Sequence, residues 1–207
     1  MTHCPACNRE FPDDVEVCPT DGTAAHRVGE QPDPLVGQTI RGRYRVLRKL
    51  GEGSGGTAYL AEQVKIRRSV VLKFLREELA GDDILLERFR REARTLARLD
   101  PRYVTRVHDL DQTDAGRLFV VMEYLEGRTL RQVLEAEGQL TLSRTLALSV
   151  QIAEGLRVAH SGGVLHRGVK PQTVMVLPDE TVKLTDFGVT ARLQVPAVPS
   201  DASAPEL

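Results

Sequence analysis

The stretch "GEGSGGTAYLAE" (residues 51–62) contains three glycines in the spacing G-x-G-x-x-G, namely Gly51, Gly53 and Gly56. The β-rich stretches "YRVLRKLG" (44–51) and "TAYLAEQV" (57–64) flank these glycines, which predicts a glycine-rich hairpin between two strands. A dinucleotide-binding fold would need a helix directly after the glycines, and a strand follows instead. We therefore expect a hairpin that folds over phosphates, because residues without side chains let backbone N–H groups approach them. A flexible turn without a ligand is the alternative.

Strands are expected mainly in the first part of the chain after residue 40 and helices mainly in the second, an order typical of an α+β protein. Thr129 and Gln132 fit a capping box that opens a short helix. The other elements predicted after the hairpin are, in chain order, a strand over 68–75, a helix of about four turns after Gly81, strands over 104–110 and 116–125, a long helix over 141–161, and short strands over 173–177 and 181–185.

Composition and charge exclude several classes of protein. The 207 residues include 28 lysines and arginines against 29 aspartates and glutamates, so no net field attracts nucleic acid or an anionic membrane. The N-terminus does not resemble a signal peptide, and the longest apolar runs are far too short to span a bilayer. We therefore expect a cytoplasmic protein with no nucleic-acid partner and no membrane partner.

Two charged residues predict a contact between the third strand and the helix that follows it. Lys73 lies at the end of the strand "RSVVLKFL", and Glu92 lies on the predicted helix beside the apolar stripe of Phe89, Ala93 and Leu96. A glutamate at the edge of an apolar stripe favours a partner of opposite charge, which a lysine on the adjacent sheet can supply. Such a pair would hold the ammonium group against nucleotide phosphates. An unpaired surface glutamate is the alternative.

Six segments in a fixed order resemble the landmarks of a bacterial serine/threonine protein kinase: "GEGSGGTAYLAE", "VVLK", "REARTLARL", "VMEYLEGRTL", "HRGVKPQTVMV" and "KLTDFGVTARL". The resemblance implies a protein-kinase-like domain over 40–194. Its N-lobe, about 40–124, would hold a five-stranded antiparallel sheet plus one helix, and a partial helical C-lobe would follow over about 125–194. Glycine and prolines in "VGEQPDPLVGQ" predict a linker over 28–39, with an extended entry strand as the alternative. The composition of residues 195–207 predicts a disordered tail.

The resemblance also implies which residues contact a nucleotide. The glycines would lie above the phosphates, Lys73 would contact the α- and β-phosphates while it pairs with Glu92, and Asp186 of "DFG" would hold Mg²⁺. Met122 would be the gatekeeper, and the backbone of two hinge residues would contact adenine. The full set is Gly51, Gly53, Gly56, Ala58, Val71, Lys73, Glu92, Met122, the hinge residues Glu123 and Leu125, and Asp186. ATP with Mg²⁺ is the cofactor that this set implies.

The catalytic loop departs from the kinase pattern at two positions. In H-R-D-x-x-x-x-N the aspartate accepts the proton of the substrate hydroxyl, and the asparagine holds a second Mg²⁺. This chain reads "HRGVKPQT" over 166–173, so Gly168 and Thr173 occupy those positions while His166, Arg167 and Lys170 remain. Glycine offers neither acid nor base, and positioned proton transfer contributes about 10² to 10⁴ in rate. We therefore expect no intact catalytic set.

Two further departures concern the nucleotide pocket. The kinase pattern V-A-I-K places an alanine on the adenine ring, and this chain has Val71 at that position. Two additional carbons in a tight slot cost roughly 1 to 3 kcal/mol, which lowers the expected nucleotide affinity. Ala58 replaces the usual valine of the glycine-rich loop, and the lost methyl contact either loosens the same pocket or compensates for Val71.

The sequence ends soon after "DFG", whereas a complete kinase domain continues through an activation segment, an A-P-E motif and several helices. The helix over 141–161 carries two apolar sides: Leu142, Leu146, Val150 and Ala153 on one, and Leu148, Ile152, Leu156 and Ala159 on the other. Without the later helices, we expect one side of this helix to lack cover. An uncovered apolar side predicts a protein partner or self-association.

The first segment, residues 1–27, has too few apolar residues to fold by burial alone, and its cysteines have the spacing of a metal site. Cys4 and Cys7 form C-x2-C, and Cys18 begins "CPTDG", so Asp21 stands where a second C-x2-C would have its last cysteine. Thiolates, imidazoles and carboxylates all bind structural Zn²⁺, which takes four ligands in a tetrahedron. The segment resembles the small zinc ribbons found beside some bacterial kinases. His3 and His26 are alternatives for the fourth ligand, and a disordered segment with free thiols is the other interpretation.

Three functional hypotheses follow from the sequence. The first is a pseudokinase, a kinase-like ATP-binding domain that acts in binding, scaffolding or signalling and is joined to a zinc ribbon. The second is an active atypical serine/threonine protein kinase in which another acid serves. The third is a structural interaction module that binds no nucleotide, which Val71 and the absent helices favour. The loss of both catalytic-loop residues favours the first hypothesis.

Overall fold

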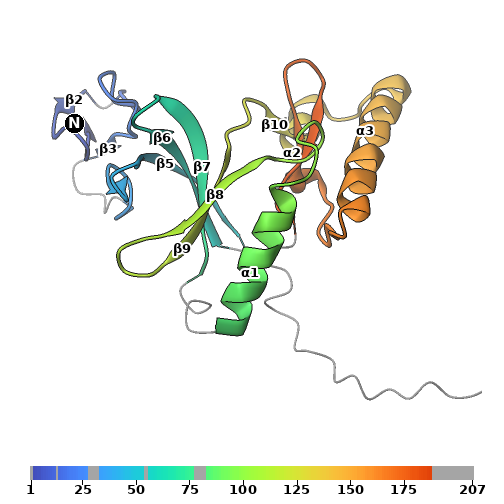
Figure 1. The fold of residues 1–207 in the computed structure, drawn as a ribbon. Helices are drawn as coiled ribbons and strands as arrows, with labels where there is room; N and C mark the ends of the chain where they lie inside the picture. Colours follow the sequence, from blue (N-terminus) through green and yellow to red (C-terminus); the bar gives the residue numbers. More distant parts are fainter. Residues whose placement is uncertain (1, 13, 28–32, 54–55, 77–82, 188–207) are drawn as a thin grey trace, which may run out of the picture.

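The computed structural model describes residues 2–12, 14–27, 33–53, 56–76 and 83–187. Figure 1 shows a small N-terminal sheet followed by two larger parts. The first part is a large twisted sheet with one helix beside it, and the second part, residues 128–184, is built from two helices and a short sheet. The mixture of strands first and helices later confirms the predicted α+β class. The predicted disordered tail, 195–207, lies outside the described residues.

The large sheet is antiparallel throughout, in the strand order β4-β5-β6-β7-β9-β8. Its strands are β4 (Thr39–Ile40), β5 (Tyr44–Gly53), β6 (Gly56–Gln63), β7 (Arg68–Phe74), β8 (Val107–Gln112) and β9 (Leu118–Glu123). The sequence predicted five strands for this sheet, and the structure has six. The additional strand is β4, which pairs with the start of β5 at the edge of the sheet. Two residues show no periodicity, so the sequence pattern did not indicate this strand.

Alternation along β7 separates a core face of the sheet from a free face. Val71 and Lys73 are partly exposed on the free face, whereas the residues between and beside them are buried. Aromatic rings fill the core on the other face, where the ring of Phe74 has its centroid 5.6 Å from that of Tyr59 and 5.2 Å from that of Phe119. The two-residue period of a strand therefore keeps the candidate nucleotide residues away from the aromatic core.

One helix, α1 (Asp83–Leu96), lies beside the large sheet (Figure 1). Its buried residues Phe89, Ala93 and Leu96 follow helical spacing, as predicted. Phe89 packs in one cluster with Leu118 of β9, so the helix is fixed against the strand that leads to the second part of the molecule.

The second part contains α2 (Leu130–Glu137), α3 (Leu142–Ser161) and a three-stranded sheet of β10 (Arg128–Thr129), β11 (Val174–Val176) and β12 (Val182–Leu184). The predicted capping box is present at the start of α2, where the Thr129 hydroxyl accepts from the Gln132 N–H and the Gln132 side chain accepts from the Thr129 N–H. The Thr141 hydroxyl caps α3 in the same manner by accepting from the Arg144 N–H. The capping box therefore marks the start of α2 as predicted, and α3 begins within the predicted range 141–161.

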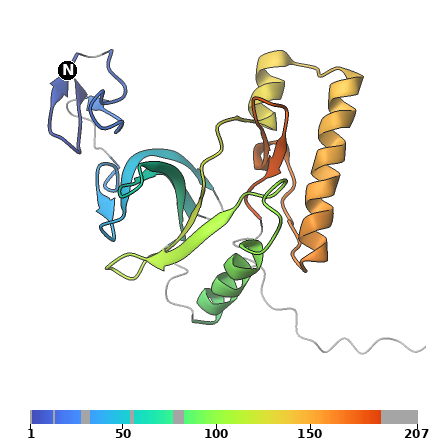
Figure 2. The same cartoon turned by 45° about the horizontal axis from the view of Figure 1, so that its top comes forward.

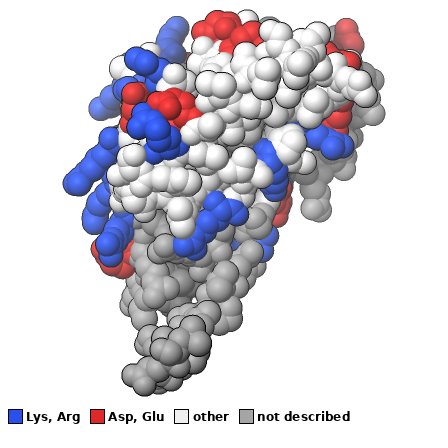
Figure 3. Space-filling view, turned by 90° about the vertical axis from the view of Figure 1, so that its right-hand side faces the viewer, with Lys and Arg blue, Asp and Glu red and all other residues white. Residues whose placement is uncertain are grey.

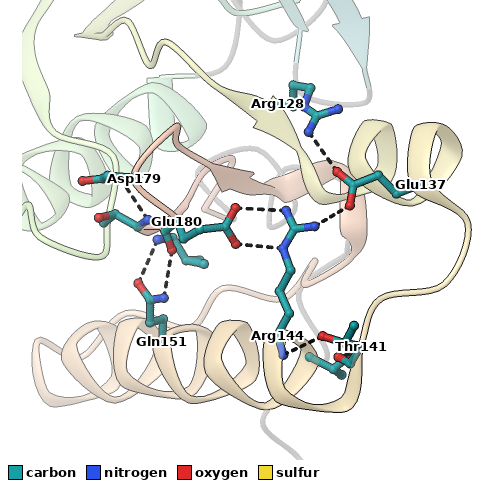
Figure 4. Close-up of polar contacts among 10 residues, drawn as sticks. Arg128, Glu137, Thr141, Arg144, Gln151, Asp179 and Glu180 are labelled. Atoms are coloured by element: carbon teal, nitrogen blue, oxygen red, sulfur yellow. Dashed lines mark hydrogen bonds and ion pairs between the residues drawn. The ribbon is translucent and has the colours of Figure 1, made fainter.

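Close packing at one glycine brings α3 against β12. A Cβ atom at Gly155 would lie 3.0 Å from the Leu184 side chain and 3.2 Å from the Tyr103 carbonyl oxygen. An ion-pair network then ties the β11–β12 turn to both helices (Figure 4): Arg144 contacts Glu137 of α2, and its Nε lies 2.8 Å from Glu180 of the turn. These contacts position the segment after β12, which carries the DFG sequence.

The two predicted sides of α3 differ in burial. Leu148 and Ala159 are buried in the core of the second part, whereas Leu142, Leu146 and Val150 are 75%, 57% and 68% exposed. The space-filling view from the side of α3 shows a broad uncharged area between clusters of charged side chains (Figure 3). Among the described helices, α3 included, none combines the length and the hydropathy needed to cross a membrane.

The N-terminal sheet contains β1 (Thr2–His3), β2 (Glu10–Phe11) and β3 (His26–Arg27) in the order β2-β1-β3. Figure 2 shows it as a separate small body beside the large sheet. A backbone hydrogen bond joins the two, in which the Ala24 N–H donates to the Leu47 carbonyl of β5 over 2.9 Å.

Candidate functional site

Predicted nucleotide-binding residues from three neighbouring strands lie in register on the free face of the large sheet. Ala58 on β6 stands opposite Lys73 on β7, and Val71 on β7 stands opposite Met122 on β9. Residues directly opposite each other in antiparallel strands point to the same face, with Cβ atoms about 4.5–5.5 Å apart. The structure therefore brings these four predicted residues together in one surface.

Val71 occupies the middle of this surface. It stands opposite Leu60 on one side and Met122 on the other, and its side chain is only partly buried. Its two γ-carbons thus narrow the space over the free face, where an alanine would leave that space open. The weakened nucleotide pocket stays a prediction, and Val71 is the position on which it depends.

The glycine-rich hairpin joins β5 to β6, and its residues 54 and 55 lie outside the described part of the chain. Gly56 has a φ of 126°, and a Cβ atom there would lie 1.9 Å from the Phe74 carbonyl oxygen, so only glycine fits. A Cβ atom at Gly51 or Gly53 would meet nothing within 4 Å. Packing among the described residues does not require glycine at 51 and 53, which leaves open space beside this backbone for a ligand.

An ion pair joins the large sheet to the DFG segment. Lys73 Nζ donates to Asp186 Oδ1 over 2.6 Å, which connects β7 with the residues after β12. Asp186 has a φ of 57°, in the left-handed region, which aspartate adopts more readily than most residues. The predicted partner Glu92 lies on α1, but its side chain is outside the described part of the chain, so the Lys73–Glu92 contact stays a prediction.

A small cavity adjoins these residues, and a wider hollow lies elsewhere on the large sheet. A cavity of about 40 Å³ is lined by Lys73, Met122 and Asp186 together with apolar side chains of α1 and β9. A wider hollow of about 630 Å³ lies between β4 and the β8–β9 turn, where Ile40 and Asp114 line it, and it contains none of the predicted nucleotide residues. The small cavity is an apolar space beside the candidate site and is too small to be the nucleotide pocket itself.

The catalytic loop has open space at the position of the missing acid. A Cβ atom at Gly168 would meet none of the described residues within 4 Å, and the φ of this glycine lies outside the left-handed region. Neither packing nor backbone conformation therefore requires glycine here. The residue leaves the loop without an acid or base at this point.

Thr173 closes the same loop on itself. Its buried hydroxyl accepts from the Lys170 N–H over 3.1 Å and lies 2.9 Å from the Gly168 carbonyl oxygen, to which it donates. A hydroxyl engaged in this way holds the loop shape. The predicted position of the second Mg²⁺ ligand is thus occupied by a residue whose hydroxyl makes its contacts within the loop.

His166 packs against the DFG segment. The imidazole is almost completely buried, and its ring centroid lies 4.4 Å from that of Phe187. Burial lowers the pKa of His166, so the ring is neutral at physiological pH. Arg167 and Lys170 are exposed, and Arg167 has a φ of 60°. The retained histidine therefore supports the position of Phe187.

A largely buried ion pair at the hinge was missed by the sequence reasoning. Glu123 at the end of β9 accepts from Lys183 Nζ of β12 over 2.6 Å and from the Arg106 N–H over 2.7 Å. The alternation of "TVKLT" was the available signal, because Val182 and Leu184 are buried and Lys183 must face the other way. Leu125 follows in the partly buried connection to β10. The Glu123 side chain thus joins the two lobes at the segment predicted to contact adenine.

The four predicted metal ligands of the N-terminal segment lie together. Ligand atoms of Cys4, Cys7, Cys18 and Asp21 are all within 4.8 Å of one another. His3 and His26, the alternatives for the fourth ligand, face each other across β1 and β3 and are not members of this group. Among the described residues, Asp21 is the one of the three candidates that lies with the cysteines.

Comparison with known proteins gives a family and several relatives. The family described as "Protein kinase domain" matches residues 44–203. The chain is similar to the serine/threonine-protein kinase PrkC of Bacillus subtilis, with 36% identity over 159 residues that cover 77% of the chain and 24% of that protein. It is also similar to the serine/threonine-protein kinase pkn3 of Myxococcus xanthus, with 39% identity over 161 residues that cover 76% of the chain and 29% of that protein.

Solved structures give the same likeness. The crystal structure of the kinase domain of PknI from Mycobacterium tuberculosis matches with a TM-score of 0.63 and 33% identity, over 74% of the chain and 61% of that structure. The chain therefore spans less than a third of these two curated relatives and less than two thirds of this solved domain.

Proposed function

Because the chain belongs to the bacterial serine/threonine branch of the protein kinase domain family, we propose that it binds ATP with Mg²⁺ and transfers phosphate poorly or not at all. The single observation behind this proposal is the contrast between Lys73 and Gly168. Lys73 contacts Asp186, the residue assigned to Mg²⁺, whereas Gly168 leaves open space where the family has its proton acceptor.

The residues present fit a nucleotide with one Mg²⁺. Gly51 and Gly53 leave space beside the hairpin backbone, and Lys73 supplies a cation beside it on the same sheet. Asp186 would hold Mg²⁺, which in this family neutralises charge on the phosphates. The two γ-carbons of Val71 take up space above the surface assigned to adenine, and this supports a reduced affinity for ATP.

Poor transfer is proposed from what the loop residues do. No side chain at position 168 can accept a proton from a substrate hydroxyl, and the Thr173 hydroxyl is engaged with Gly168 and Lys170. Proton acceptance of this kind contributes about 10² to 10⁴ in rate. Retention of ATP without rapid transfer would suit a binding, scaffolding or signalling role.

An active serine/threonine kinase is the second candidate. The observation that favours it is the likeness to proteins named as serine/threonine kinases, together with the retained Lys73–Asp186 pair. Positioning and electrostatic stabilisation supply much of phosphoryl transfer, so a slow reaction without the aspartate is chemically coherent.

One experiment separates these candidates. ATP and ADP are titrated with and without Mg²⁺ while thermal stability is followed, and terminally labelled ATP is then offered with a generic protein acceptor. Mg²⁺-dependent stabilisation without label on protein is the expected result. Label that disappears in Lys73→Ala would establish the kinase instead. No stabilisation by either nucleotide would establish an interaction module that binds none.

A further inference from the structure

The ligand atoms of the N-terminal segment have the separations of a tetrahedral metal site. Zn²⁺ binds sulfur at about 2.3 Å and carboxylate oxygen at about 2.0–2.2 Å, so tetrahedral angles place two sulfurs about 3.8 Å apart and a sulfur and an oxygen about 3.6 Å apart. The Sγ atoms of Cys7 and Cys18 are 3.7 Å apart, and Cys4 Sγ lies 3.7 Å and 3.6 Å from the two carboxylate oxygens of Asp21. The Cys7–Cys18 and Cys4–Asp21 separations match two opposite edges of such a tetrahedron, and all four ligand atoms lie within 4.8 Å of one another.

Two turns with the same backbone pattern carry these ligands. In the first, the Asn8 N–H donates to the Cys4 carbonyl and the Cys4 N–H donates to the Arg9 carbonyl, both over 2.9 Å. In the second, the Gly22 N–H donates to the Cys18 carbonyl over 2.9 Å and the Cys18 N–H donates to the Thr23 carbonyl over 2.8 Å.

The two turns also match in conformation. Asn8 and Gly22, at equivalent positions, both have a positive φ, of 56° and 73°. Superposing the two patterns puts Asp21 at the place that Cys7 has in the first turn. The second turn is therefore built as a metal-ligating turn whose last ligand is a carboxylate.

We propose that Cys4, Cys7, Cys18 and Asp21 bind one Zn²⁺ ion as a closed structural site, with Asp21 as the fourth ligand. Cys4 and Cys18 are buried, which suits a site without an open coordination position. Three thiols and one carboxylate favour Zn²⁺ over Mg²⁺ or Ca²⁺, which prefer oxygen ligands. Binding would release the thiol protons, because thiolates are the ligands.

The same residues hold the segment to the large sheet. The backbone carbonyl of Asp21 accepts from Arg45 Nη2 of β5 over 3.4 Å, and Arg45 also pairs with Glu62 of β6 over 2.5 Å. Next to the first turn, a Cβ atom at Gly37 would lie 3.1 Å from the backbone of Pro5. A metal that fixes both turns therefore fixes the surface in contact with β5, and its loss is expected to destabilise the whole chain.

The first test uses the full chain and the metals themselves. Protein stripped with a chelator is titrated with Zn²⁺ and with Co²⁺, and bound metal is counted by elemental analysis. We expect one equivalent of metal, Co²⁺ absorption bands of a tetrahedral site with thiolate ligands, and a rise in melting temperature with Zn²⁺. Less than half an equivalent, or octahedral Co²⁺ bands, would overturn the site. An unchanged melting temperature would overturn its link to the large sheet.

The second test addresses the fourth ligand with a matched pair of variants. Asp21→Ala should weaken Zn²⁺ binding at least about tenfold, because removing even a residue that only orients a metal ligand lowers metal affinity by about 10- to 100-fold. Asp14→Ala removes an exposed acid from the same segment and should leave affinity unchanged. Equal affinities in the two variants would show that Asp21 is not a ligand.

A gain-of-ligand variant covers the case in which Asp21→Ala does not fold. Asp21→Cys should give Co²⁺ bands of a four-thiolate site and tighter Zn²⁺ binding, whereas unchanged bands in folded Asp21→Cys would also exclude Asp21. Metal content and Co²⁺ absorption do not depend on ATP. These measurements therefore test the metal site independently of the proposed function.

Discussion

The sheet face and the catalytic loop form two sides of the candidate site, and they keep different parts of the kinase pattern. The sheet face keeps Lys73, which we assign to the nucleotide phosphates, beside a hairpin with open space at Gly51 and Gly53. The loop keeps a residue that holds structure, because His166 packs on Phe187. Gly168 stands where the family has its aspartate, and no described residue lies within 4 Å of a Cβ atom placed there.

This difference separates two kinds of constraint. Removing a side chain that packs, such as His166, would leave a cavity or expose buried groups and so lower stability. Removing an acid that faces open space costs little stability and takes away chemistry alone. Under the proposed function, we expect a loop without the acid to keep the packing that holds Phe187.

The largest effect is expected from placing an aspartate at position 168 of the catalytic loop. Gly168→Asp should fold, since a Cβ atom there meets nothing within 4 Å, and it should raise ATP hydrolysis by about 10²-fold or more through positioned proton acceptance. Single-turnover release of phosphate from ATP measures the rate. Gly168→Ala is the matched control, because it adds the Cβ atom without the carboxylate. Equal rates in the two variants would mean that more than the acid has been lost.

The next largest effect should come from the sheet face. Lys73→Ala removes the cation assigned to the phosphates, and a charged hydrogen bond contributes about 1.5–3 kcal/mol, or about 10- to 150-fold in affinity. Calorimetric titration of ATP with Mg²⁺ measures the loss. Lys65→Ala, at an exposed turn residue between β6 and β7, is the control and should bind like the unchanged chain. Equal affinities would show that the retained lysine no longer contacts nucleotide.

A smaller effect on nucleotide affinity is expected from Val71 on the sheet face. Val71→Ala should tighten binding of ATP and of adenosine by about fivefold, from the low end of overpacking costs near 1 kcal/mol, because Val71 is only partly buried. Inorganic tripolyphosphate should bind both proteins equally, since it has no adenine. Tighter binding of tripolyphosphate as well would place the effect of Val71 on the phosphates and contradict its assignment to adenine.

Local sequence signals were enough to predict most helices and strands, and to predict which residues of β7 lie on the free face of the large sheet. The period-two pattern of β7 placed Val71 and Lys73 on the same side, and the capping box of Thr129 and Gln132 marked the start of α2. These features depend on neighbours within a few residues. The same holds for the two sides of α3, which follow from helical spacing alone.

Contacts between distant segments could not be predicted in this way. Lys73 pairs with Asp186 across 113 positions, and Glu123 pairs with Lys183 across 60, so neither partner is visible in any local window. The role of Thr173 was also hidden, because its position was read as that of a metal ligand, whereas its hydroxyl contacts lie inside the loop. Such pairs form only when the two lobes pack against each other in the folded chain.

The smallest predicted effect is a pH dependence of folding stability, which tests the packing of His166 in the catalytic loop. Burial lowers the pKa of His166, so the unfolded chain, with a histidine pKa near about 6.5, binds more protons than the folded chain below that pH. His166 therefore makes stability fall as pH drops below about 6.5, by at most about 1.4 kcal/mol per pH unit for one proton.

His166→Phe keeps an aromatic ring against Phe187 and should flatten this acid-side loss, measured by urea unfolding between about pH 5 and pH 7.5. His160→Gln, at an exposed residue near the end of α3, should keep the slope of the unchanged chain. If both variants keep that slope, His166 does not titrate as a buried neutral group. The loop would then not be held by the packing on which the comparison rests.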